Sequence, residues 1–78
     1  MRERAYQKLK NDTTPHVALH IRDGIAMELY PDSRKERLNL VTGVWPTIVD
    51  DMKRDSRVRK SQTIIDQNPR DMWQWVAT

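Results

Sequence analysis

Residues 17–29 read Val17-Ala-Leu-His-Ile-Arg-Asp-Gly-Ile-Ala-Met-Glu-Leu29. Large apolar residues stand at 17, 19 and 21 and again at 25, 27 and 29, a period of two that is typical of strands with one buried face. The dipeptide Asp23-Gly24 between the two runs is a hairpin signal. A three-residue loop, Arg22-Asp23-Gly24, pairs the apolar residues across the strands and leaves one face wholly apolar. We therefore predict a β-hairpin over residues 16–30.

A helix is the competing interpretation of the same residues. Val17, Ile21, Ile25 and Leu29 would then form one stripe, but Leu19 and Met27 would lie off it. Gly24 would also stand in the middle of the helix, at a cost of about 1 kcal/mol. The hairpin avoids both penalties.

His16 and His20 form the one pattern that resembles a metal site. They would occupy adjacent turns of a helix but lie about 13 Å apart on a strand, at ~3.3 Å per residue. A third ligand is not apparent in either case, so we expect no metal and no cofactor.

The segment that follows begins with Ser33-Arg-Lys-Glu36, which matches a capping box and predicts a helix over about 34–42. A third strand, with Leu38, Leu40 and Thr42 alternating, is the alternative. Further on, we predict a short helix over 61–68 with Ile64 and Ile65 inward. Asn68 and Pro69 then start a last helix that buries Trp73 and leaves Trp75 exposed.

The whole chain, residues 1–78, is predicted to be a single small domain of α+β class. We expect residues 2–10 to form a short helix or a frayed basic arm, with residues 1–12 as the bounds of a flexible arm, followed by the hairpin and three or four short helices. The chain has no cysteine, no run of about 20 apolar residues and no signal peptide, so we expect a cytoplasmic protein without a membrane partner.

Charge is unevenly distributed along the chain. Residues 1–10 carry a charge of +3, and residues 53–60, with five Lys or Arg and one Asp, carry +4. The remaining residues sum to −4, which leaves the net charge of +3. The adjacent carboxylates Asp50 and Asp51 would point in different directions on a helix and do not form a catalytic pair. Neither a nucleophile elbow nor a glycine-rich phosphate loop is present, so we do not expect an enzyme.

The segment from Leu38 to Arg54 resembles the helix-turn-helix of bacterial and phage repressors. Gly43 fits the turn, Val44 the small apolar position after it and Val49 the inward position of the second helix, while Pro46 suits a first turn. The resemblance implies a small DNA-binding transcription regulator. Its expected DNA contacts are Thr47, Asp50, Asp51 and Arg54 near bases, and Lys53, Arg57, Arg59 and Lys60 on phosphates. The two aspartates depart from this pattern, because phosphates repel them.

The alternative function is a non-enzymatic protein-binding module, such as a small inhibitor or adaptor encoded by a phage or another mobile element. Trp45 and Trp75 would then be the contact residues. A homodimer is compatible with both functions, since a chain of this length buries a limited core.

Overall fold

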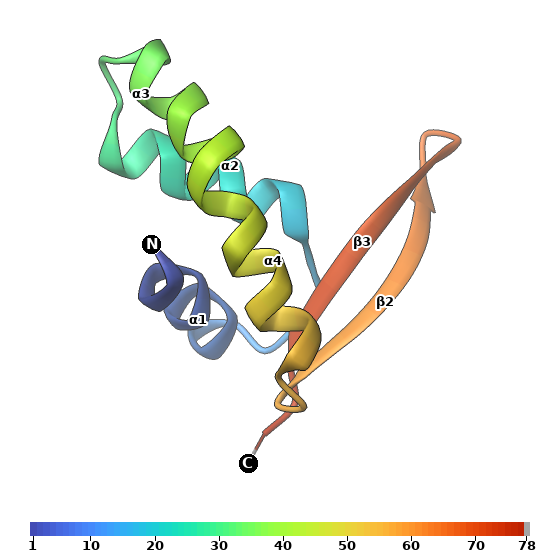
Figure 1. Cartoon of the computed structure of the whole chain (residues 1–78). Helices are drawn as coiled ribbons and strands as arrows, with labels where there is room; N and C mark the ends of the chain where they lie inside the picture. The colour runs from blue at the N-terminus through green and yellow to red at the C-terminus, as the bar shows by residue number, and fades with distance from the viewer. Residues whose placement is uncertain (78) are drawn as a thin grey trace.

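The computed structural model describes residues 1–77 and has the predicted α+β class, with helices packed against one antiparallel sheet (Figure 1). The elements in chain order are α1 (Arg2–Asn11), β1 (His16–Val17), α2 (Ala18–Leu29), α3 (Arg34–Asn39), a π-helical segment η1 (Leu40–Val44), α4 (Trp45–Arg54), β2 (Val58–Ile65) and β3 (Asn68–Trp75). Over this range, no helix combines the length and the apolar composition needed to cross a membrane.

The sheet has the strand order β1-β3-β2, and both pairings are antiparallel. Strand β3 lies in the middle, where Trp73 pairs with His16 on one side and with Lys60 on the other. Asp66 and Gln67 join β2 to β3 and both have positive φ, 50° and 67°, as a two-residue hairpin loop requires. The hairpin extends well past the helices, so that only its base is covered (Figure 1).

The predicted hairpin over residues 16–30 is wrong, because residues 18–29 form helix α2. Its buried side chains are Ala18, Ile21, Ile25 and Ala26, which share one face of a helix. The period-two pattern arose from Leu19 and Met27, which remain 36% and 53% exposed. Two exposed apolar residues thus produced the strand signal.

The two helices predicted beyond residue 60 are also wrong, since this part of the chain forms β2 and β3. Strand β2 buries Val58 alone, and Ile64 and Ile65 lie exposed near the tip of the hairpin rather than inward. Most of the hairpin has solvent on both faces, so its sequence lacks the apolar alternation of a half-buried strand. Trp73 is buried, as predicted.

Residues 34–54 form one continuous helical path, because η1 joins α3 directly to α4. The helix predicted over 34–42 is confirmed, whereas the turn predicted at Gly43 is absent and no described glycine has positive φ. Pro46 explains the wider π turn that precedes it. A proline inside a helix has no N–H to donate and collides with the carbonyl four residues earlier, here that of Thr42.

The core joins the helices to the base of the hairpin. Its central contact is the stacking of Trp45 of α4 on Trp73 of β3, with ring centroids 5.3 Å apart and an interplanar angle of 25°. Helix α1 contributes Ala5 and Leu9, both fully buried, so the N-terminal segment is a packed helix and not a flexible arm. The other members of the core are Ala18, Ile21, Ile25, Ile48, Met52 and Val58.

Replacing Trp73 by Ala should destabilise the domain by about 3–5 kcal/mol, because the side chain is 4% exposed and its loss leaves a large cavity beneath Trp45. Urea denaturation followed by circular dichroism measures the change. Ile64→Ala, at a position 74% exposed, is the matched control and should change stability by less than about 0.5 kcal/mol. Equal losses in the two variants would contradict this arrangement of the core.

Replacing Gly43 by Ala should stabilise the domain by about 0.5–1 kcal/mol, because Gly43 is helical and an added Cβ meets no atom within 4 Å. Gly24→Ala in α2 is the companion variant and should also be stabilising, since its Cβ would only touch the Lys8 side chain at 3.8 Å. A loss of stability for Gly43→Ala together with a gain for Gly24→Ala would show that the chain turns at Gly43 after all.

Candidate functional site

Two helices joined by a short turn lie one element earlier than the sequence predicted. Helix α2 ends at Leu29, α3 begins at Arg34, and the two helices pack against each other. Ser33 Oγ accepts a hydrogen bond from the backbone N–H of Glu36 at 3.2 Å, which is the N-cap predicted from the sequence. Arg37 Nη1 closes the turn by donating to the carbonyls of Tyr30 at 2.7 Å and Pro31 at 3.0 Å.

One face of the long helix over 34–54 is exposed along its whole length. The members of this stripe, which we call the outer face, are Lys35, Leu38, Asn39, Thr42, Pro46, Thr47, Asp50 and Arg54. The opposite side buries Leu40, Trp45, Ile48 and Met52. The outer face is therefore available for binding while the core holds the helix in place.

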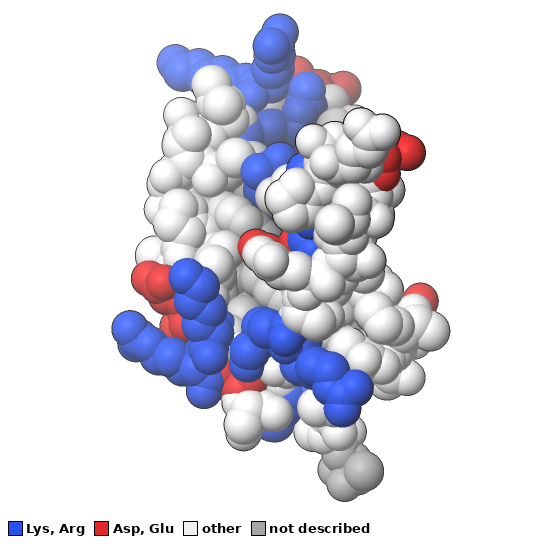
Figure 2. All heavy atoms as spheres, turned by 90° about the vertical axis from the view of Figure 1, so that its right-hand side faces the viewer, with Lys and Arg blue, Asp and Glu red and all other residues white. Residues whose placement is uncertain are grey.

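Cations lie at both ends of this helix. Arg34 and Lys35 stand at its start, and Lys53 and Arg54 at its end, some 20 residues or about 30 Å away. Arg59 and Lys60 of β2 follow directly after that end. Within residues 1–77, none of these six side chains forms an ion pair. Figure 2 shows Lys and Arg gathered mainly in an upper and a lower group on the face that carries the hairpin, with charged atoms of both signs also present at the centre between them.

The residues expected near bases lie in different environments. Thr47, Asp50 and Arg54 lie on the outer face, but the Thr47 hydroxyl donates to the Val44 carbonyl at 2.7 Å. Asp51 is only partly exposed and accepts from Arg2 of α1 at 3.2 Å. Asp51 therefore pairs with α1 and does not belong to the outer face.

The residues expected on phosphates are divided as well. Lys53 and Arg59 are exposed and form no ion pair among residues 1–77, and Lys60 donates only to the Asp55 carbonyl, at 2.8 Å. Arg57 instead makes two hydrogen bonds to the Asp55 carboxylate, at 2.9 and 2.6 Å. This paired geometry fixes Arg57 as part of the structure.

Asp55 is the centre of a polar cluster between α4 and β2. Its carboxylate accepts from Arg57 and, at 2.6 Å, from the hydroxyl of Tyr6 in α1. Hydrogen bonds from Arg57 and then Tyr6 hold the pKa of Asp55 well below its usual range. Burial, followed by the hydrogen bond and negative charge of Asp55, raises the pKa of Tyr6.

The two tryptophans expected to bind a partner do not lie free at the surface. Trp45 is 6% exposed and belongs to the core. Trp75 is half-buried and lies edge-on to Tyr6, with centroids 6.1 Å apart. Arg57 and Lys10 cover its ring at 5.2 and 4.9 Å from the centroid. Both side chains therefore serve packing in this structure.

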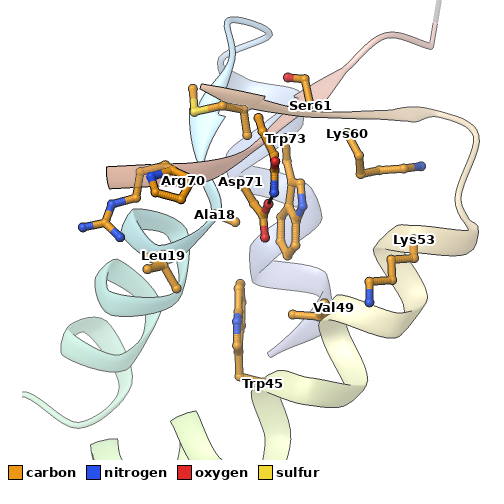
Figure 3. A pocket seen from close by; sticks show the side chains of 13 residues that line it. Ala18, Leu19, Trp45, Val49, Lys53, Lys60, Ser61, Arg70, Asp71 and Trp73 are labelled. Carbon is orange, nitrogen blue, oxygen red and sulfur yellow. Dashed lines mark hydrogen bonds between the residues drawn. The ribbon is translucent and has the colours of Figure 1, made fainter. Parts of the chain in front are cut away.

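A cavity of about 330 Å³ opens between the start of α2, helix α4 and the inner face of the hairpin (Figure 3). Trp45, Trp73 and Val49 line it, and Figure 3 shows the two indoles one above the other with Val49 beside them. Lys53, Lys60, Arg70 and Asp71 also line it. The cavity thus combines apolar walls with charged groups at its edge.

Neither histidine belongs to a metal cluster in the part of the chain described. His16 Nε2 lies 2.7 Å from the Asp12 carbonyl oxygen, and His20 is exposed on α2. No group of three His, Cys, Asp or Glu side chains within residues 1–77 is placed to hold a metal ion.

Sequence reasoning missed Arg34, Lys35 and Arg70 as candidate site residues. A signal for the first two was present, because the Ser33 capping box already placed them in the first turn of a helix. Arg70 lines the cavity only because residues 68–75 form a strand, which the sequence analysis did not predict.

No protein-family model matches this chain, and no curated protein and no solved structure is significantly similar to it.

Replacing Asp55 by Asn should remove a part of the stability that depends on pH. Because the folded-state pKa of Asp55 is depressed, its contribution is fully present above the unfolded pKa of about 3.9 and is lost as the pH falls below that value. The difference in unfolding free energy between wild type and variant should thus be largest near pH 6 and shrink towards pH 2. Asp50→Asn, at an exposed position, is the control, and its unfolding free energy should change with pH in the same way as that of the wild type. A wild-type-to-Asp55→Asn difference that stays constant with pH would contradict this role.

Proposed function

We propose that this chain binds double-stranded DNA through the outer face of its long helix. The observation that carries the proposal is the order of its elements: α2, a four-residue turn, the long helix over 34–54 and then the β2–β3 hairpin. Two packed helices joined by such a turn are the DNA-binding motif in which the second helix enters the major groove. A hairpin directly after the second helix gives the arrangement known as a winged helix.

The cations support a phosphate-binding role for both ends of the long helix. Arg34 and Lys35 would contact phosphates at its start, while Lys53 and Arg54 would do so at its end. Arg59 and Lys60 extend the second group onto the base of the hairpin. The tip of the hairpin carries Asp66 and no cation, so the base of the hairpin is the part suited to phosphates.

The side chains between the two cationic ends are suited to base edges. Asn39 can bond adenine through N6 and N7, and Leu38 and the Thr42 methyl can contact the thymine methyl. Because a helix N-terminus generally leads into the groove, these residues replace Thr47, Asp50 and Asp51 as the principal base contacts.

Neutralising Arg34, Lys35 and Arg54 together, each to Gln, should weaken DNA binding uniformly across sequences. The slope of log affinity against log salt should fall by up to about 2.7, at ~0.9 per phosphate contact. Fluorescence anisotropy with random and selected duplexes measures both quantities. Lys10→Gln, on α1 and over the Trp75 ring, is the control and should leave the slope unchanged.

Substituting Asn39 by Ala should instead change which duplex sequence is preferred, with little effect on the salt dependence. If the wild-type protein does not bind any duplex at ~50 mM salt, where phosphate contacts are strongest, the proposal fails.

A protein-binding module is the second candidate, and exposed apolar side chains favour it. Leu38 and Val44 on the long helix are 60% and 44% exposed, and Ile64 near the hairpin tip is 74% exposed. This candidate uses the same helix but not its cations. The protein-binding candidate would be favoured over DNA binding if Leu38→Ser no longer captured a protein partner while the triple variant of Arg34, Lys35 and Arg54 still did.

A further inference from the structure

The two edges of the projecting β2–β3 hairpin differ in how they are protected (Figure 1). On the β3 side, β1 pairs with Met72 and Trp73, and Pro69, which has no N–H, interrupts the edge nearer the tip. On the β2 side, no further strand is present within residues 1–77, and the segment 61–65 holds neither a proline nor a charge. Proteins generally protect an exposed edge with proline, charge or a covering element. The outer edge of β2 is therefore a template for a further strand.

The backbone groups that this edge offers follow from the pairing of β2 with β3. The N–H of Val76 donates to the carbonyl of Arg57 at 2.9 Å, so this position of the ladder is a hydrogen-bonded one. Such positions alternate along an antiparallel pair, and Pro69 opposite Ile64 fits the alternate kind, where β3 needs no N–H towards β2. The alternate residues of β2 thus direct their backbone N–H and C=O groups away from β3. In the open part of the edge these outward residues are Lys60, Gln62 and Ile64.

The open part of the edge lies towards the tip of the hairpin. At the base, the outward N–H of Val58 is already used, since it donates to the Asp55 carbonyl at 3.1 Å. Towards the tip, Ile64 and Ile65 are 74% and 40% exposed, and consecutive strand residues point to opposite faces. A strand added to this edge would therefore gain backbone hydrogen bonds and cover an apolar side chain on each face.

We propose that β2 pairs antiparallel with β2 of a second copy of this chain, about a two-fold axis at Gln62. Lys60 then lies opposite Ile64 of the partner subunit, and all three outward residues of each copy occupy hydrogen-bonded positions. A shift of two residues in either direction places an outward residue opposite the turn or opposite the closed base. The register is therefore defined by the backbone alone, without use of the DNA-binding face.

The side chains brought together by this register favour a second copy over a strand of another protein. The methylene stems of Lys60 and Arg59 would cover Ile64 and Ile65 of the partner subunit while their charged ends stay in water. No like charges lie directly opposite each other. The tip, which carries Asp66, would approach the cationic base of the other hairpin. One strand thus supplies both halves of the contact.

Analytical ultracentrifugation of the full chain tests the pairing. The wild type should form a dimer at concentrations below about 1 mM, the Kd of a weak association. Gln62→Pro removes an outward N–H that the β2–β3 ladder does not use, so the circular dichroism spectrum should be kept. The dimer Kd should rise by at least about tenfold, because two hydrogen bonds are lost across the axis.

Three outcomes would overturn the proposal. A wild type that stays monomeric would leave the edge to a strand of another protein. Open-ended assemblies would exclude a closed two-fold contact. A dimer that Gln62→Pro does not weaken would place the interface elsewhere on the chain.

A pair of charge variants at one exposed position tests the register without disturbing the core. Ile64→Lys puts a cation opposite Lys60 of the partner subunit, whereas Ile64→Glu puts an anion there. The dimer Kd of Ile64→Lys should exceed that of Ile64→Glu by at least about threefold, since the axis repeats the pair. Equal values in the two variants would contradict this register, even if Gln62→Pro fails to fold.

Discussion

The stacking of Trp45 on Trp73 joins the long helix to the sheet, and the rest of the structure depends on it. Trp73, like its neighbour Met72, pairs with both adjacent strands, so the contact that holds the Trp73 ring also helps to fix the positions of β1 and β2. A chain of 78 residues without cysteine has few other means of holding a hairpin against helices. The same two indoles line the cavity between α4 and the hairpin, so the contact that stabilises the fold also shapes that cavity.

The Ser33 cap could be predicted from the sequence because it depends on local chemistry that tertiary structure did not override. The α+β class and the burial of Trp73 were also predicted, but from a hairpin over 16–30 and a helix after Asn68 that the structure does not contain. Helix α2 was mistaken for a hairpin because periodicity counts apolar residues without knowing which of them are buried. Ala18 and Ala26 carry part of its buried face, and small side chains contribute little to an apolar pattern. As a result, the helix-turn-helix was predicted within residues 38–54, whereas the two helices joined by a short turn are α2 and α3.

The C-terminal hairpin could not be recognised by amphipathic alternation, because most of it has no core to face. Two weaker strand signals were present in the sequence. One is the run of β-branched residues Thr63-Ile64-Ile65 before a polar turn, and the other is the alternation Trp73-Gln74-Trp75 after it. The turn predicted at Gly43 was wrong for a different reason, because a glycine followed closely by a proline is also typical of a turn. In the folded chain Pro46 widens a helix that continues, and this outcome depends on the packing of Trp45 beside it.

Pairing between β1 and β3 brings His16 beside Trp73, two positions separated by most of the chain. During synthesis, α1, α2 and the long helix leave the ribosome before the strand that closes their core has been made. Until Trp73 emerges, the indole of Trp45 and the apolar faces of three helices stay uncovered. The nascent chain therefore passes through an interval in which these apolar faces are exposed to solvent, and this interval ends when β3 docks.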